Sequence, residues 1–148
     1  MAIMKALSVK QPYASLIADG EKDVELRTWT TDHRGALLIC SSSKGILHKP
    51  REKELRAQFE RTWPDGVALC VVDLADIIPW PSRKHDPKAA TALAQRIGEE
   101  AVCDMCGEGF DARAFDYEGY AWILKDPRPL DAPFPVKGKL HLFDVEIP

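Results

Sequence analysis

The 148-residue chain lacks several features that define large classes of proteins. It has no apolar run long enough to cross a bilayer, and its first residues, Met-Ala-Ile-Met-Lys, lack the basic region and long apolar stretch of a secretory signal. It also has no glycine-rich phosphate loop, no Ser-His-Asp order and no paired histidine motif. We therefore predict a cytoplasmic protein that has no membrane partner and uses none of these common motifs.

Cysteine is scarce, and its four positions do not form a known metal-binding pattern. In a reducing compartment we expect Cys40, Cys70, Cys103 and Cys106 to be thiols rather than disulfides. The Cys103-x-x-Cys106 spacing invites a zinc site, but zinc takes four ligands and no second pair follows. His85 is the nearest other ligand, and one histidine does not complete the set. We predict no metal and no cofactor.

A large excess of charge of one sign is also absent, because the net charge is −3. The charge is nevertheless uneven. Residues 1–56 hold ten Lys and Arg against seven Asp and Glu, which leaves the rest of the chain acidic. A local basic surface suits a compact nucleic-acid or nucleotide site better than a long DNA footprint. Ordinary composition, with no internal repeat and no linker, predicts one domain over residues 1–148.

Apolar segments bounded by turn residues predict six strands and few helices. The predicted strands are Lys5–Val9, Asp23–Trp29, Ala36–Cys40, Val67–Ile78, Tyr120–Leu124 and His141–Ile147, and the predicted helices run from Pro12 to Gly20, over Arg51–Arg61 and over Lys88–Ala101. Ser41 to Ser43 should end the third strand, and the proline-rich stretch Pro127–Gly138 should be an extended connection. Asp19-Gly20 would also fit a hairpin turn, but the helical spacing before it favours a helix closed by Gly20. This order predicts an α+β fold, a mixed β-barrel of about six strands with covering helices.

The segment Gly20–Trp29 places Lys22, Glu25 and Arg27 close together. In a strand, side chains alternate between two faces, so Glu25, Arg27 and Trp29 share one face and Val24 and Leu26 share the other. The charged face either lines a cleft for an anionic ligand or is exposed with a solvated ion pair. The segment alone leaves both interpretations open.

Seven motifs occur together along the chain: Ala6–Ala14, Gly20-x-Lys22-x-x-Glu25-x-Arg27-x-Trp29, His33-Arg34-Gly35, Pro64-x-Gly66, Val72-Asp73-Leu74, Tyr120–Leu124 and Pro135–Gly138. Taken together, they resemble the ASCH domain, the activating signal cointegrator homology family. The resemblance spans nearly the whole chain, which makes it far more specific than any one motif. It implies a PUA-like fold with a cleft for RNA or a nucleotide.

The family includes more than one activity. Some small bacterial members deacylate N4-acetylcytidine, others are reported as ribonucleases, and the eukaryotic coactivator domain is linked to nucleic-acid binding. The deacylases use a lysine, a threonine and a glutamate. The lysine matches Lys22, but Glu25 occupies the threonine position, and the third residue has no clear match, Glu99 and Glu100 being only guesses. A carboxylate is no substitute for a nucleophilic hydroxyl, so the resemblance implies deacylation less strongly than binding.

We expect a site with either a binding or a catalytic role. The ligand-binding candidates are Lys10, Gln11, Arg27, Arg34, Ser41, Ser42, Lys44 and Lys137, and the catalytic candidates are Lys22, Glu25 and Tyr13. Several of these residues have an ordinary structural alternative. The helical spacing of Tyr13 also fits a core residue, Arg34 also fits a surface arginine, and the serines also fit the end of a strand.

RNA, single-stranded nucleic acid or a nucleotide is the predicted partner. The alternatives are a metal-independent ribonuclease, with Glu25 or Tyr13 transferring a proton, and an amidohydrolase of the N4-acetylcytidine type. A protein partner stays open as well, because acidic residues after Asp104 form a distinct segment.

Overall fold

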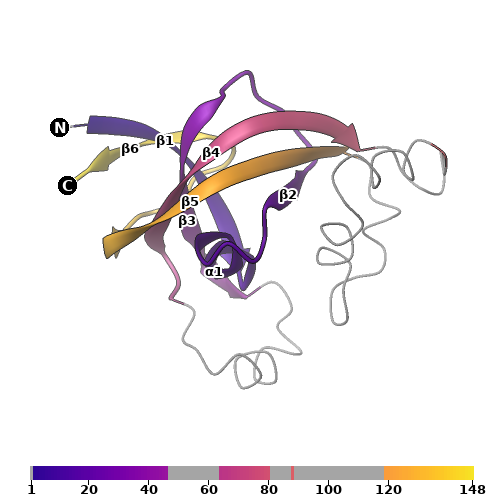
Figure 1. The fold of residues 1–148 in the computed structure, drawn as a ribbon. Coiled ribbons are helices and arrows are strands. Elements are labelled where there is room, and N and C mark those ends of the chain that lie inside the picture. The colour runs from indigo at the N-terminus through magenta and orange to yellow at the C-terminus, as the bar shows by residue number, and fades with distance from the viewer. Residues whose placement is uncertain (1, 47–63, 81–87, 89–118) are drawn as a thin grey trace. The chain divides into compact units, whose positions relative to one another are not determined.

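A computed structural model describes residues 2–46, 64–80, 88 and 119–148 of the chain (Figure 1). In chain order its elements are β1 (Ala2–Gln11), α1 (Tyr13–Ala18), β2 (Val24–Arg27), β3 (Gly35–Ile46), β4 (Val67–Trp80), β5 (Gly119–Pro135) and β6 (Phe143–Ile147). The helix predicted over Arg51–Arg61 lies outside the described residues, as does the one over Lys88–Ala101 apart from Lys88, which is helical. All six predicted strands are present.

The strands form one sheet in the order β2-β5-β4-β3-β1-β6. β1 runs parallel to β3 and antiparallel to β6, and β2 runs antiparallel to β5. The predicted closure into a barrel is wrong, because a barrel needs its two end strands to pair and here the order ends at β2 on one side and β6 on the other. Covering helices are not confirmed either, since the described residues contain one complete helix, the six-residue α1.

The chain divides into two compact units. The first unit comprises residues 1–21, 35–73 and 126–148, and the second comprises residues 22–34 and 74–125. β4 and β5 each contribute residues to both units. The single domain over residues 1–148 therefore stays a prediction, and the units are described separately below.

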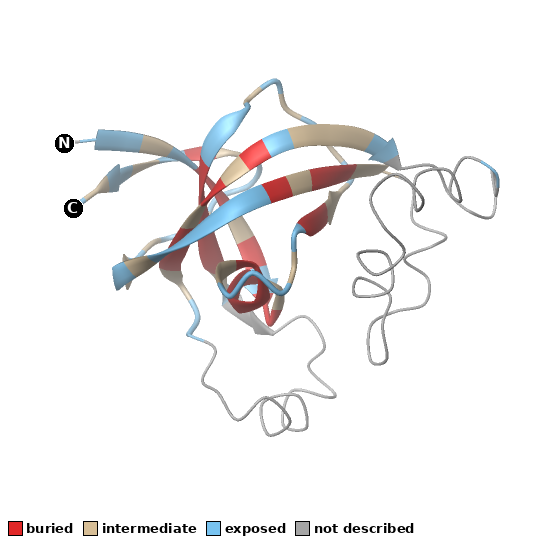
Figure 2. Cartoon of the chain, viewed as in Figure 1, coloured by how far each residue is buried: buried red, intermediate tan, exposed pale blue. Residues whose placement is uncertain are grey.

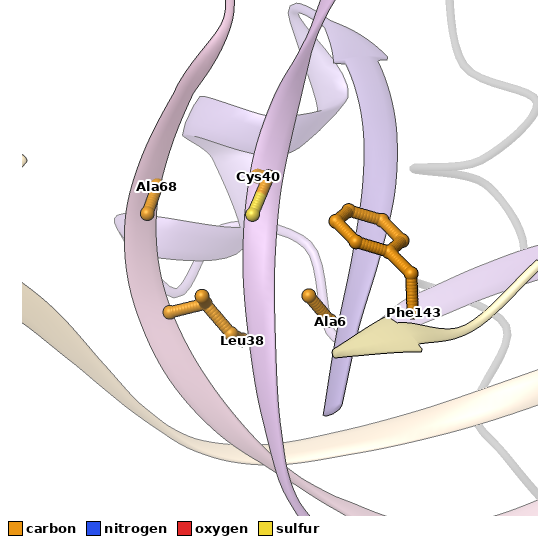
Figure 3. Close-up of a cluster of buried hydrophobic side chains, with 5 residues drawn as sticks. All are labelled: Ala6, Leu38, Cys40, Ala68 and Phe143. Carbon is orange, nitrogen blue, oxygen red and sulfur yellow. The ribbon is translucent and has the colours of Figure 1, made fainter. Parts of the chain in front are cut away.

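The core of the first unit lies where β1, β3, β4 and β6 bring small and apolar side chains together. Ala6, Leu38, Cys40, Ala68 and Phe143 form this cluster (Figure 3). Ala6 pairs with Leu38 on one side and with Phe143 on the other, so three strands meet at one alanine. Figure 2 shows the buried positions of these strands in red.

Both cysteines in the described part of the chain are buried and free. Burial raises the pKa of the Cys40 thiol and that of the Cys70 thiol to about 12, so both are protonated at neutral pH. The thiol prediction is confirmed for these two, whereas Cys103 and Cys106 lie outside the described residues.

The helix α1 ends as its sequence predicts. Gly20 has a φ of +80°, a left-handed conformation that favours glycine. Its N–H donates to the carbonyl of Ile17 at 3.1 Å, and the N–H of Glu21 donates to the carbonyl of Leu16 at 3.0 Å. These two bonds form a Schellman motif, which places Lys22 directly after the helix end.

Two predicted strand ends are wrong. β3 continues through Ser41 to Ser43, because the Ser41 hydroxyl accepts a bond from the N–H of Val67 at 3.1 Å and its carbonyl accepts one from the N–H of Gly66. β5 continues through four prolines to Pro135. Proline fits an extended backbone, and its missing N–H costs little where the strand is exposed, as most of β5 is after Leu124.

Candidate functional site: a charged triad on the β2–β5 ladder

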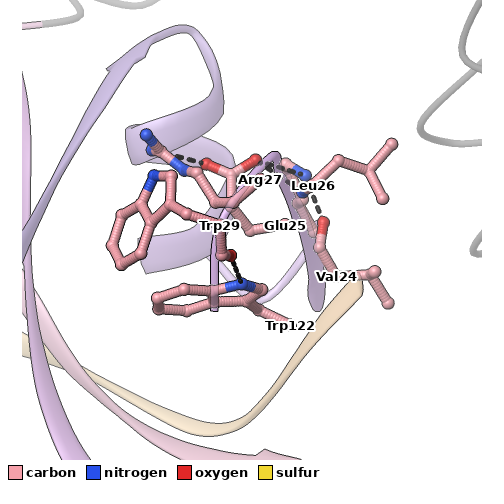
Figure 4. Close-up of polar contacts among 7 residues, drawn as sticks. Val24, Glu25, Leu26, Arg27, Trp29 and Trp122 are labelled. Atoms are coloured by element: carbon pink, nitrogen blue, oxygen red, sulfur yellow. Dashed lines mark hydrogen bonds and ion pairs between the residues drawn. The ribbon is translucent and has the colours of Figure 1, made fainter. Parts of the chain in front are cut away.

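The pairing of β2 with β5 determines which side chains share a face. Glu25 lies opposite Trp122, and Arg27 lies opposite Tyr120. Residues directly opposite in an antiparallel pair project to the same side, so these four side chains share one face. Figure 4 shows Glu25, Arg27, Trp29 and Trp122 grouped away from the side chains of Val24 and Leu26. The predicted alternation is confirmed, although β2 itself ends at Arg27.

Lys22, Glu25 and Arg27 form a connected group, named here the charged triad. Lys22 Nζ lies 3.4 Å from Glu25 Oε1, and Arg27 Nη2 lies 3.2 Å from Glu25 Oε2. Glu25 Oε1 also accepts a hydrogen bond from the N–H of Leu26 at 3.1 Å, and Lys22 Nζ donates to the carbonyl of Val24. Both carboxylate oxygens are thus engaged, and the contacts hold Lys22 against the start of β2.

The triad is not a solvated surface pair. The exposed fraction is 9% for the Lys22 side chain, 11% for Glu25 and 25% for Arg27. Burial disfavours the charged form of Glu25, but the charges of Lys22 and Arg27 and their hydrogen bonds outweigh it and lower the pKa of the carboxyl below its ordinary value. Glu25 is therefore ionised at neutral pH. Two cations and one anion leave the group with one net positive charge, with Arg27 its most accessible member.

Two tryptophans support the end of this face. Trp122 is fully buried, and its Nε1 donates to the carbonyl of Trp29 at 3.4 Å. The two rings meet edge to face, with centroids 4.9 Å apart and planes at 79° (Figure 4). Trp122 is part of the core, and Trp29 is half-buried.

Arg34, the other predicted ligand residue of the second unit, is exposed. Its Nη1 donates at 2.8 Å to the carbonyls of Thr31 and His33, which stabilises the loop before β3. The remaining candidates belong to the first unit, and their association with the triad stays a prediction.

Gln11 is fully buried, and its amide is used inside the protein. Its Nε2 donates to Ser15 Oγ at 2.8 Å and to the carbonyl of Pro64 at 2.9 Å, and its Oε1 accepts from the N–H of Ser15 at 3.0 Å. Gln11 thus joins the first turn of α1 to the segment before β4. These contacts give it a structural role.

The other candidates of the first unit differ in accessibility. Lys10 and Lys137 are exposed, Tyr13 and Ser42 are half-buried, and Ser41 is buried against β4. Lys44 lies within β3, and the structure describes its backbone only.

Tyr120 lies on the same face as Arg27 but was not among the residues predicted for the site. The sequence assigned this tyrosine only to a strand, whereas the structure places it directly opposite Arg27 and half-buried. The signal that identifies it is the register of β2 against β5, which one sequence does not specify.

The described residues contain neither a cluster of metal ligands nor a helix that could span a membrane. No group of three or more His, Cys, Asp or Glu in residues 2–46, 64–80, 88 and 119–148 could hold a metal ion. In the same ranges, no helix has both the length and the apolar character needed to span a bilayer.

Sequence comparison gives a family and two curated relatives. The family model of the ASCH domain matches residues 7–134. Activating signal cointegrator 1 from Homo sapiens and from Mus musculus are each 30% identical to the chain over 151 residues, which is 95% of this chain and 22% of the relative. The chain therefore spans about a fifth of the length of the curated relatives it matches.

Structural comparison gives the same fold. The crystal structure of ASCH from Zymomonas mobilis matches with a TM-score of 0.52 and 18% identity, covering 90% of this chain and 73% of that one. A tyrosine-to-phenylalanine variant of that protein matches with a TM-score of 0.55 and 19% identity, covering 89% and 75%. At such identity the likeness shows the fold alone.

Proposed function

Because this chain belongs to the ASCH domain family, we propose that it binds single-stranded RNA or a nucleotide, with the charged triad as its phosphate contact. Arginine and lysine recognise phosphate in different ways, arginine through its planar fork and lysine as a point charge. The triad supplies one of each. Glu25 orients both and keeps them from repelling each other.

The observation that carries this proposal is the placement of two cationic side chains around one ionised carboxylate, with the guanidinium of Arg27 partly accessible. Such a group suits an anionic ligand better than a single ion pair does, because it offers two positively charged donors. Arg27 has a quarter of its side chain exposed, so a phosphate can approach it while Lys22 and Glu25 stay in place.

The same electrostatics favour binding over proton transfer by Glu25. A general base works best with a pKa near the operating pH, and the two cations move the pKa of Glu25 in the opposite direction. A ribonuclease would therefore need a different proton acceptor. Tyr13 is the candidate from the sequence, and its association with the triad stays a prediction.

The test is fluorescence anisotropy with a short labelled single-stranded RNA. Lys22→Met should weaken binding about tenfold, because it makes the triad neutral and leaves the Glu25–Arg27 pair intact. Arg128→Gln is the matched control, since Arg128 is also ion-paired but exposed, with Asp73 and Asp126 as its partners. Equal affinities for Lys22→Met, the control and the unsubstituted protein would remove the triad from the binding site.

Two enzymatic alternatives are tested with the same proteins. RNA is incubated with the purified protein in chelator, and N4-acetylcytidine is incubated separately. Metal-independent cleavage of RNA, or release of acetate, that disappears in Lys22→Met would replace the binding proposal by a hydrolase that uses Lys22 for electrostatic stabilisation. Turnover that survives the substitution would come from another site or from a contaminant.

A further inference from the structure

The aromatic side chains around Arg27 point to what else the ligand must contain, an inference that rests on the proposed function. Tyr120 lies directly opposite Arg27 on the paired strand β5, and Trp29 lies two residues after Arg27 in the sequence. Both are half-buried. A cation with two aromatic residues on the same face is suited to a nucleotide, because phosphate binds the cation while a base stacks on a ring.

The register of β2 against β5 places Tyr120 on the same face of the sheet as Glu25 and Arg27 of the charged triad. The Cβ atoms of directly opposite residues in an antiparallel pair lie roughly 5 Å apart, so the phenol ring starts beside the Arg27 side chain. Its other neighbour on the same face is Trp122, two residues along β5, which is fully buried and supports the strand from within. Tyr120 is thus a half-buried residue on a rigid, paired element.

Trp29 is held on the same side by Trp122. The two rings form an edge-to-face pair at 79°, which fixes the orientation of the Trp29 indole against the fully buried Trp122. Figure 4 shows the Trp29 indole on the same side of β2 as the Arg27 guanidinium. The hydrogen bond from the indole Nε1 of Trp122 to the Trp29 carbonyl fixes Trp29 although it lies beyond the end of β2.

We infer that Tyr120 and Trp29 form the base-stacking position of the site, so that its ligand is an unpaired nucleotide whose base lies against these rings while its phosphate contacts Arg27. Tyr120 makes the larger contribution to base stacking, because it lies directly opposite Arg27 and belongs to the longer strand. The site then distinguishes a nucleotide from a bare phosphate or an abasic strand.

The experiment compares two labelled strands, a short oligouridylate and the same strand with abasic residues, by anisotropy. The unsubstituted protein should bind the base-bearing strand about tenfold tighter or more, since stacking on one ring accounts for a factor of this size. Tyr120→Leu should abolish the difference, because leucine keeps the apolar bulk but has no ring face. Tyr120→Phe and Trp29→Phe should preserve it, and circular dichroism checks that all variants fold.

Each other outcome overturns the inference in a recognisable way. Equal affinity for both strands, with Lys22→Met weakening both, would leave the phosphate site standing and remove the stacking position. A Tyr120→Leu variant that weakens both strands equally would give Tyr120 only a structural role. Binding of neither strand would remove the proposed function together with the inference.

Discussion

Replacing Glu25 by glutamine is expected to lower the free energy of unfolding by about 3 kcal/mol at neutral pH. The substitution keeps the shape of the side chain but leaves Lys22 and Arg27, two largely buried cations, without their shared anion. The measurement is urea unfolding followed by circular dichroism. Glu146→Gln is the matched control, because Glu146 is an exposed residue of β6, and it should change stability by less than about 0.5 kcal/mol.

The same substitution should remove a specific pH dependence. The pKa of Glu25 is lower in the folded protein than its ordinary value of 4.5, so the unfolded chain binds the proton more readily. The contribution of Glu25 is therefore complete above about pH 4.5 and is lost as the pH falls through the folded-state pKa. The stability difference between the unsubstituted protein and Glu25→Gln should shrink over that acidic range. A difference that stays constant from neutral to acidic pH would contradict the paired, ionised state of Glu25.

Replacing Gln11 by alanine is expected to cost about 2–3 kcal/mol of stability without a selective loss of RNA affinity. The truncation removes the partners of the Ser15 N–H and of the Pro64 carbonyl, and a buried polar group left without its bond costs roughly 1–3 kcal/mol. It also leaves a cavity where a fully buried side chain was.

Thermal and urea unfolding measure the loss, and anisotropy at a temperature where the variant is folded measures affinity. Lys10→Ala, on the same strand but exposed, is the control and should be nearly neutral in stability. A Gln11→Ala variant of normal stability that no longer binds RNA would restore Gln11 as a ligand residue and contradict its structural role.

Two local features around the charged triad were predicted correctly from the sequence. The period of two placed Glu25 and Arg27 on one face of β2, and glycine at a helix end predicted the left-handed turn at Gly20 that leads into Lys22. Both signals are contained within a few consecutive residues. They needed no knowledge of distant partners.

The features that the sequence did not predict concern contacts between segments distant in sequence. Ser41 looked like the end of a strand because its hydrogen-bond partners are Val67, the first residue of β4, and Gly66, which precedes it. The internal contacts of Gln11 were not predicted because the carbonyl of Pro64 lies 53 positions away. Tyr120 was missed for the same reason, since only strand register places it opposite Arg27.

Closure into a barrel was the largest error in the fold. Six strands are enough for a small barrel, but closure depends on which strands form the two ends, and strand order is a property of the whole chain. The prolines of β5 added to the error, because they suggested a connection where an exposed strand continues.

The measurement that tests the central claim most directly is the salt dependence of RNA affinity for the unsubstituted protein and for Lys22→Met. If the cations of the triad contact a phosphate, the logarithm of the association constant falls linearly with the logarithm of salt concentration. The slope should then become shallower by about 0.7 in Lys22→Met, the value for one phosphate of a single strand. Arg128→Gln should keep the original slope. Identical slopes for the unsubstituted protein and Lys22→Met would contradict a phosphate contact at the triad.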